Sequence, residues 1–195
     1  EFAGLERFIC EYFLKNRQLA CVMEVHTAIT TYCTLNCINC NMFMPYYKQR
    51  MHLTFEQLKD NIDLLMSHID YIFKYQIVGG EPFLNKDLSD FLIYLKDKYG
   101  DRIGRIRIIS NGMICPDEKL ICALQKSNAE VNISDYSNAV GYKDKLKQTK
   151  NVLQNAQVNY MIIPSLRWRD FGFPHSPCNR PIQMIREHML RCGTA

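Results

Sequence analysis

Short apolar segments rich in β-branched and aromatic residues alternate with longer amphipathic segments along most of this chain. Segments of the first kind are typical of strands, and those of the second kind are typical of helices. A helix between two consecutive strands carries the chain back over the sheet, so such strands pair in parallel. The alternation therefore predicts an α/β fold built on a parallel sheet.

Five strand–helix units can be counted. Strands are predicted at residues 22–32, 71–78, 103–109, 130–134 and 158–163. Helices are predicted at about 5–14, after Thr54, at 86–99, after Pro116, at 141–156 and at 181–190. Five such units fit a partial (β/α) barrel of about five to six parallel strands, and a flat doubly wound sheet is the alternative.

Local signals predict where two of these helices begin. Thr54 and Gln57 have the spacing of a capping box. Pro116 stands where a proline is tolerated, at the first position of a helix.

The length of 195 residues fits one domain, and it is short for a complete eightfold barrel. We expect a single domain over residues 1–195, with a core at about 20–164 and a C-terminal tail at 165–195. A net charge of +4 is too small to indicate a nucleic-acid partner. The sequence has no apolar run of membrane-spanning length and no signal-peptide layout, so we expect a cytoplasmic protein, and its two ends suggest a segment of a longer chain.

Three of the nine cysteines lie within eight residues, directly after the first predicted strand. Cys33, Cys37 and Cys40 place three thiols on one loop, a number that suits three irons of a cubane cluster and leaves the fourth iron open. A structural zinc site normally takes four ligands, and the nearest further candidate, His26, lies within the strand itself. An iron–sulfur cluster is favoured; a zinc knuckle or three structural thiols are the alternatives.

Two more motifs end predicted strands. Gly79-Gly80-Glu81-Pro82 follows the second strand, and Ser110-Asn111-Gly112 follows the third. The carboxyl ends of parallel strands meet at one edge of the sheet, so both motifs are expected beside the cysteine loop. Without side chains, Gly79 and Gly80 are expected to let a ligand approach the backbone.

The C-x3-C-x2-C spacing followed by Gly-Gly-Glu-Pro resembles the radical S-adenosylmethionine (SAM) superfamily, over roughly residues 20–164. The resemblance implies one [4Fe-4S] cluster on Cys33, Cys37 and Cys40. It further implies that SAM chelates the open iron, with the strand end at Gly79, Gly80 and Glu81 holding its amino group. The implied reaction is reductive cleavage of SAM to a 5′-deoxyadenosyl radical, which takes a hydrogen atom from a substrate.

Four further residues are implied as contacts of SAM. Ser110 and Asn111 match a segment that approaches its ribose and carboxylate. Ser134 and Asp135 end the fourth predicted strand, where the family often contacts the ribose.

One position departs from the family pattern. The residue before the third cysteine is usually aromatic and lies near the adenine, but here it is Asn39. Phe43, Tyr46 or backbone groups are left as candidates for that contact.

The resemblance leaves the substrate open. A peptide or protein is favoured because the C-terminal region resembles the start of the extension found in peptide-modifying members, with a sugar or nucleotide-sugar close behind. Cys178 and Cys192 are either free thiols or part of an auxiliary cluster, whereas Cys10, Cys21, Cys115 and Cys122 are expected to be buried. A flavodoxin or ferredoxin is the implied reductant. The alternatives are a non-catalytic iron–sulfur or zinc module and a degenerate fragment of such an enzyme.

Overall fold

A computed structural model of the 195-residue chain describes residues 20–37, 40–136 and 141–164. The helices predicted at 5–14 and 181–190 lie outside these residues. Cys10, Cys178 and Cys192 also lie outside them, so what was expected of these cysteines stays a prediction.

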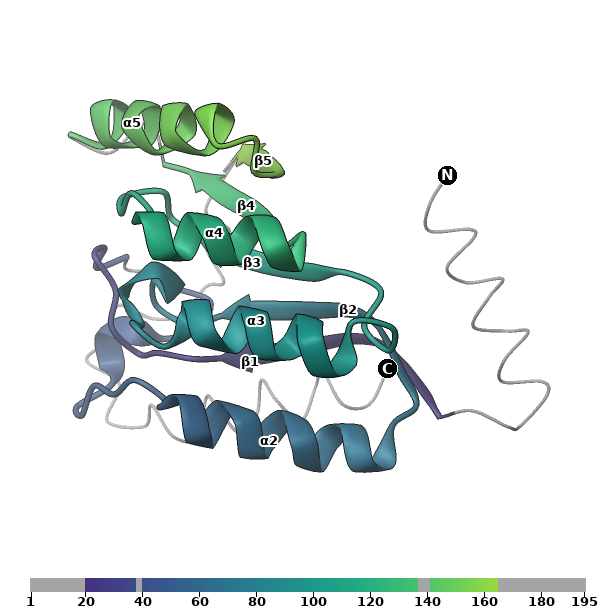
Figure 1. The fold of residues 1–195 in the computed structure, drawn as a ribbon. Helices are drawn as coiled ribbons and strands as arrows, with labels where there is room; N and C mark the ends of the chain where they lie inside the picture. The colour runs from purple at the N-terminus through teal and green to yellow at the C-terminus, as the bar shows by residue number, and fades with distance from the viewer. Residues whose placement is uncertain (1–19, 38–39, 137–140, 165–195) are drawn as a thin grey trace.

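The described strands form one parallel sheet in chain order, β1-β2-β3-β4-β5 (Figure 1). Their bounds are β1 Cys21–Ala28, β2 Tyr71–Val78, β3 Ile106–Ser110, β4 Glu130–Asp135 and β5 Tyr160–Pro164. Each strand lies beside its predecessor, whereas a doubly wound sheet reverses its order at one point. The fold is therefore the predicted partial barrel rather than the flat alternative.

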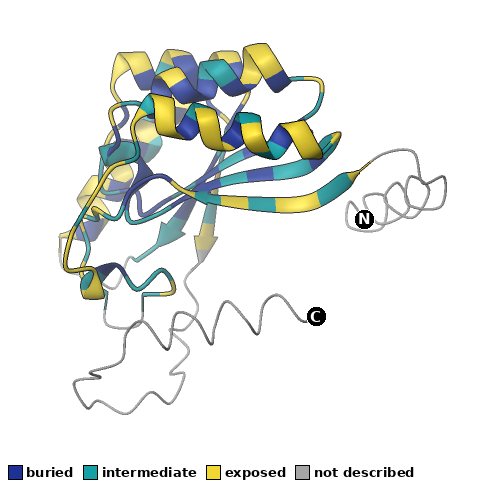
Figure 2. Ribbon diagram, turned by 90° about the horizontal axis from the view of Figure 1, so that it is seen from below, coloured by how far each residue is buried: buried dark blue, intermediate teal, exposed yellow. Residues whose placement is uncertain are grey.

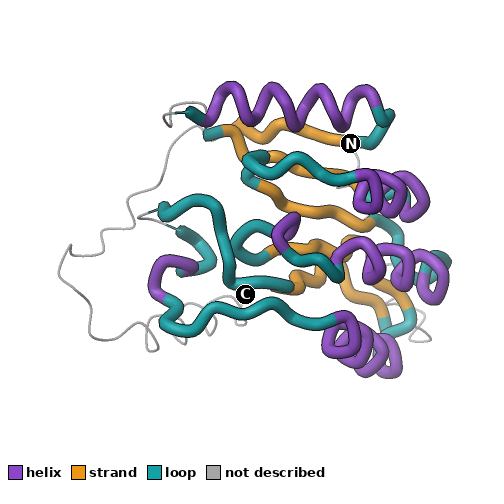
Figure 3. The backbone as a smooth tube through the Cα atoms, turned by 60° about the vertical axis from the view of Figure 1, so that its left-hand side comes forward, coloured by secondary structure: helices purple, strands orange, loops and turns teal. Residues whose placement is uncertain are grey.

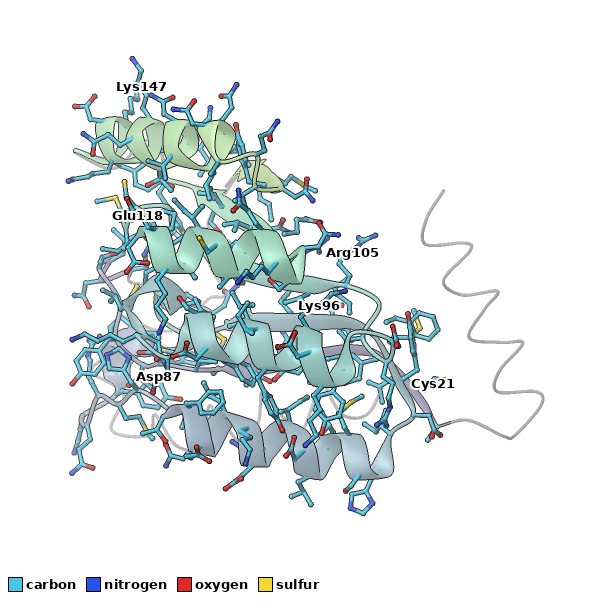
Figure 4. All side chains as sticks on the ribbon, viewed as in Figure 1. Cys21, Asp87, Lys96, Arg105, Glu118 and Lys147 are labelled. Carbon is cyan, nitrogen blue, oxygen red and sulfur yellow. The ribbon has the colours of Figure 1, made fainter. Side chains whose placement is uncertain are left out.

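Four helices cover one face of this sheet (Figures 1 and 3). They are α2 Phe55–His68, α3 Leu88–Tyr99, α4 Glu118–Ser127 and α5 Tyr142–Asn155, and two short 3-10 turns, η1 Met44–Tyr46 and η2 Pro82–Leu84, lie in the loops. Polar side chains such as that of Lys147 point away from the sheet (Figure 4). The other face of the sheet carries no helix among the residues that are described.

The core lies between the helices and the sheet, where Figure 2 shows the buried residues. Alternate strand residues enter it, because successive side chains of a strand point to opposite faces. Tyr75 and Ile77 of β2, Ile106 and Ile108 of β3, and Val131 and Ile133 of β4 are buried and follow this alternation, whereas Ile72 at the start of β2 is fully buried without following it. Burial of each such side chain contributes roughly 1.5–3 kcal/mol, so this layer fixes which strand residues face away from the helices.

One of the two predicted helix starts is confirmed and the other is wrong. The Thr54 hydroxyl accepts from the Gln57 backbone N–H at 3.3 Å, and the Gln57 side chain accepts from the Thr54 N–H at 3.0 Å, which completes the capping box. Helix α4 instead begins after Asp117, whose carboxylate accepts from the Leu120 N–H at 2.8 Å. Pro116 precedes this cap, because the aspartate supplies the acceptor that a helix start needs.

Two other expectations need correction. The first strand ends at Ala28 rather than residue 32, and the chain then turns into the cysteine loop. Cys115 and Cys122 are exposed and Cys21 is only half-buried, so these thiols are not core residues. No helix in residues 20–37, 40–136 and 141–164 has the length and apolar character needed to cross a membrane.

Candidate functional site

The cysteine loop lies directly against the end of β2, and two glycines make this contact possible. The N–H of Gly80 donates to the Thr30 carbonyl at 2.9 Å, and the N–H of Glu81 donates to the Tyr32 carbonyl at 2.7 Å. A Cβ atom at Gly79 would lie 2.4 Å from the Thr30 oxygen, and one at Gly80 would lie 2.0 Å from the Tyr32 oxygen. Gly79 also has a φ of +141°, which L side chains rarely adopt. The absence of side chains at Gly79 and Gly80 thus lets the chain's own loop approach β2, and the expected contact of this strand end with SAM stays a prediction.

Glu81 fastens the end of β2 to the end of β3. Its carboxylate is fully buried and accepts from the Ser110 hydroxyl at 2.9 Å, the Asn111 N–H at 2.7 Å and the Phe83 N–H at 3.2 Å. Burial raises the pKa of Glu81 to about 7, against the opposing effect of these three donors. Protein donors therefore engage both carboxylate oxygens, and the side chain is not exposed to solvent.

Asn111 joins β3 to the cysteine loop through its side chain. Its amide nitrogen donates to the Thr34 hydroxyl at 2.9 Å and lies 3.6 Å from the sulfur of Cys33, within hydrogen-bonding range of a thiol. Its amide oxygen accepts from the Met113 N–H at 2.9 Å. The side chain that the sequence assigned to SAM thus contacts the cysteine loop itself.

Tyr142, which no motif singled out, ties the ends of β3 and β4 together. Its side chain is fully buried, and its hydroxyl lies 2.7 Å from the Asn111 carbonyl and within hydrogen-bonding distance of the Ser134 carbonyl. The phenol has one proton, so it donates to one carbonyl at a time. Ser134 and Asp135 lie half-buried at the end of β4, as predicted. Their contact with SAM stays a prediction.

An aromatic residue follows β4 at the same edge. Tyr136 packs edge-on against Tyr142 with ring centroids 5.8 Å apart. Burial raises the pKa of Tyr136 to about 12, and the nearby thiolates of the cysteine loop act in the same direction. Sequence reasoning missed this residue, because a lone tyrosine after a strand matches no motif. Asn39 lies outside the described residues, so the adenine contact stays open.

The three cysteines are half-buried on the same loop. Burial raises the pKa of Cys33 and of Cys37, and the neighbouring thiols raise both further, so the sulfurs lie close enough to affect one another. In the described part of the chain no three His, Cys, Asp or Glu side chains converge on one point. His26 is engaged within β1, with its Nε2 2.7 Å from Glu24. Three thiols without a histidine as fourth ligand fit an iron–sulfur cluster that keeps one iron open. Because the thiolate is the form that binds metal, the three thiols must lose their protons when the cluster binds.

A cavity of about 260 Å³ lies at the opposite edge of the sheet. Lys96 and Arg105 are among its lining residues (Figure 4). It lies at the amino ends of β3 and β4, far along the strands from the cysteine loop. In barrel-like folds that end serves stability rather than chemistry, so the cavity is not part of the candidate site.

The sequence matches a known family over most of the described sheet. The family described as the Radical SAM superfamily matches residues 27–157. This span contains the three cysteines, the Gly-Gly-Glu-Pro strand end and the end of β4.

Two curated relatives match shorter stretches. The uncharacterized protein MJ0907 of Methanocaldococcus jannaschii is 31% identical over 107 residues, which cover 54% of this chain and 36% of that protein. The GTP 3′,8-cyclase of Campylobacter jejuni is 29% identical over 117 residues, which cover 57% of this chain and 35% of that enzyme. The chain thus spans little more than a third of the length of these relatives.

Solved structures share the fold. Streptococcus suis SuiB, bound to its precursor peptide SuiA, superposes with a TM-score of 0.59 at 18% identity, over 80% of this chain and 36% of SuiB. The enzyme anSMEcpe, with bound AdoMet and a Kp18Cys peptide, gives a TM-score of 0.55 at 17% identity, over 73% of this chain and 42% of that one. At these identities the likeness extends to the fold alone.

Proposed function

Because the chain belongs to the radical SAM superfamily, we propose that it binds one [4Fe-4S] cluster through Cys33, Cys37 and Cys40 and cleaves SAM reductively. The observation that carries this proposal is the way the cysteine loop is held. The Gly-Gly-Glu strand end fixes the backbone of the loop, and Asn111 contacts Cys33. Such support orients cluster ligands before the metal arrives.

The ends of β2, β3 and β4 would hold SAM beside the open iron. The backbone at Gly79 and Gly80 would accept its amino group, while Ser110, Ser134 and Asp135 would contact its ribose. Cys33, Cys37 and Cys40 would hold the cluster, which would supply the electron for reductive cleavage of SAM and so allow a hydrogen atom to be taken from the substrate. The protein's own part is to fix the loop and to shield the site from water.

For the substrate, a peptide or protein is the favoured class. Two proteins of the same fold, SuiB and anSMEcpe, were solved with peptides bound. A guanine nucleotide is the second candidate, because a GTP 3′,8-cyclase is among the relatives. The whole protein's substrate stays a proposal, since the chain covers only part of these proteins.

A small reducing protein such as flavodoxin or ferredoxin is the proposed electron donor. The cytoplasm is the proposed location, because its reducing conditions keep thiols available for metal.

Electron paramagnetic resonance (EPR) tests the open iron. The chain is reconstituted anaerobically with iron and sulfide, reduced with dithionite and measured with and without SAM. We expect a [4Fe-4S] signal that changes shape when SAM is added, because SAM becomes a ligand of one iron. A signal that is unchanged by SAM supports a non-catalytic iron–sulfur module instead, and a colourless zinc-loaded protein supports a zinc site.

A further inference from the structure

The cysteine loop leaves the sheet and returns to it at one point. The loop begins after Ile29 and ends before Leu53, and the Leu53 N–H donates to the Ile29 carbonyl at 2.9 Å. We call this pair of residues the neck, because all three cysteines lie in the chain between them. Gly80 and Glu81 hold the loop beyond the neck through their backbone N–H groups. The neck itself is held by a side chain that follows in the same segment, that of Asn85.

The Asn85 carboxamide binds both halves of the neck. Asn85 follows the η2 turn, and its amide nitrogen donates to the Ile29 carbonyl at 2.9 Å and to the Leu53 carbonyl at 2.9 Å. Its amide oxygen accepts from the Asp87 N–H at 2.9 Å. Only 4% of the residue is exposed, so water competes little for these groups. Because both donors and the acceptor are engaged, one orientation of the carboxamide satisfies all its partners.

Asp87 holds the chain where it enters helix α2, directly after the neck. Its carboxylate accepts from the Phe55 N–H at 2.9 Å, although Asp87 itself precedes α3 (Figure 4). The side chain makes no capping bond to its own helix. Asn85 and Asp87 thus join the returning chain, at Leu53 and Phe55, to the segment that begins with the Gly-Gly-Glu strand end. The loop cannot pivot about its neck without breaking these bonds.

The start of a helix does not require the two donors of Asn85. The Asp87 N–H needs one acceptor, which an aspartate or a serine at position 85 would also supply. Of the short side chains, only asparagine adds two N–H donors to that acceptor. The carboxamide therefore matches the two carbonyls of the neck, and the start of α3 alone does not account for it.

We propose that Asn85 is a positioning residue, which holds the neck so that the cysteine loop faces the strand ends where SAM would bind. This role rests on the proposed function, because it concerns the placement of the cluster ligands relative to SAM. The side chain binds the neck and Asp87 rather than a cysteine, and Gly80 and Glu81 hold the loop independently of it. Loss of Asn85 should therefore spare assembly of the cluster and weaken binding of SAM.

The first test measures amide hydrogen exchange in the cluster-free chain by mass spectrometry. Asn85→Leu keeps the size of the side chain and removes its hydrogen-bonding groups, whereas Asn85→Asp keeps the acceptor for Asp87 and removes the donors. We expect both variants to exchange the Leu53 and Thr31 N–H groups at least threefold faster, because the neck opens locally more often. Wild-type exchange in Asn85→Asp would limit the residue to starting α3 and would overturn the proposal.

The matched control is Ser127→Ala at the other edge of the sheet. The buried Ser127 hydroxyl also contacts two backbone carbonyls, those of Ala123 at 2.7 Å and Leu124 at 3.3 Å. It lines the cavity at the amino ends of the strands, away from the cysteine loop. We expect wild-type exchange at the neck in this variant. Equally fast exchange there would show that general destabilisation opens the neck, which would overturn the role of Asn85.

The second test measures SAM binding to the reconstituted, unreduced chain by equilibrium dialysis with labelled SAM. We expect wild-type iron and sulfide in Asn85→Leu and Asn85→Asp, with the Kd for SAM raised roughly three- to tenfold. Ser127→Ala should bind SAM as the wild type does. A wild-type Kd in both Asn85 variants would overturn the positioning role, and so would loss of their iron, since the neck would then serve assembly.

Failure of the proposed function gives a different result. A wild-type chain with a complete [4Fe-4S] cluster that binds no SAM would contradict the proposed function. Hydrogen exchange in the cluster-free chain would still decide whether Asn85 holds the neck, because that measurement needs neither cluster nor SAM.

Discussion

The backbone N–H of Glu81 donates a 2.7 Å hydrogen bond to the carbonyl of Tyr32, the residue that precedes the first cysteine of the loop. The two residues are far apart in sequence, and this bond places the cysteine loop on the end of β2. Buried at the same point, the Glu81 carboxylate binds the end of β3. The cysteine loop and the ends of β2 and β3 are thereby held in one arrangement, and the predictions below test its parts.

Gly80→Ala should prevent normal cluster assembly. The added methyl group would lie 2.0 Å from the Tyr32 oxygen, so the cysteine loop has to move. Iron and sulfide per chain after reconstitution should fall at least severalfold. Gly141→Ala is the control for an added methyl group without a clash: the positive φ of 73° strains an alanine there, but no atom lies within 4 Å of the added Cβ, so its iron content should match the wild type. Full iron content in Gly80→Ala would contradict the proposed role of this contact.

Asn111→Leu should shift the reduction potential of the cluster to a more negative value. The substitution keeps the size of the side chain but removes the donor 3.6 Å from the Cys33 sulfur, and hydrogen bonds to sulfur help to set cluster potentials. A redox titration monitored by EPR measures the shift. Thr34→Val removes only the other partner of this amide and should change the potential less. Equal potentials in wild type and Asn111→Leu would refute this role.

Glu81→Gln should flatten the dependence of stability on pH. The pKa of Glu81 is raised from 4.5 to about 7 in the folded chain. Between these values only the unfolded state releases the proton, so the free energy of unfolding should fall as pH rises from about 4.5 to 7, by on the order of 2 kcal/mol. Urea denaturation of the cluster-free chain at several pH values checks this. An unchanged slope in the variant would show that another group causes it.

Asp63→Asn should lower the free energy of unfolding at neutral pH, because it weakens the hydrogen bonds that join Asp63 of α2 to side chains of α3. Desolvation opposes ionisation of Asp63, but hydrogen bonds from Lys98, Tyr94 and Tyr99 lower its pKa to about 2. This depressed pKa stabilises the fold above pH 4, and the effect is lost as pH falls from about 4 to 2. We expect a loss of roughly 1 kcal/mol at pH 7 that shrinks in acid. Thermal unfolding at both pH values measures it, and an equal loss at pH 2 would contradict an ionised Asp63.

The sequence predicted the sheet well where the pattern was local. Strand β2 has its predicted bounds because a β-branched and aromatic segment ends at two glycines. The first strand was predicted too long, because residues 29–32 still look strand-like, whereas β1 ends at Ala28 and Thr30 pairs with His52 instead. Tyr142 could not be predicted as part of the site, since its role depends on contacts to β3 and β4 rather than on a local pattern.

For the site, the motifs predicted which strand ends meet but not what their side chains do there. Asn111 and Glu81 lie at the strand ends where the sequence placed them, and the side chains of both are hydrogen-bonded to other groups of the protein. Such contacts arise between segments far apart in the chain, so residue spacing carries no information about them.

The most direct test of the central claim is anaerobic formation of 5′-deoxyadenosine. The reconstituted chain is reduced with dithionite and given SAM, beside Cys37→Ala and the matched control Cys122→Ala, which changes an exposed thiol on α4. We predict 5′-deoxyadenosine from the wild type and from Cys122→Ala, and none from Cys37→Ala. A wild-type chain with a complete [4Fe-4S] cluster that forms no 5′-deoxyadenosine would contradict the claim that this cysteine loop supports radical SAM chemistry.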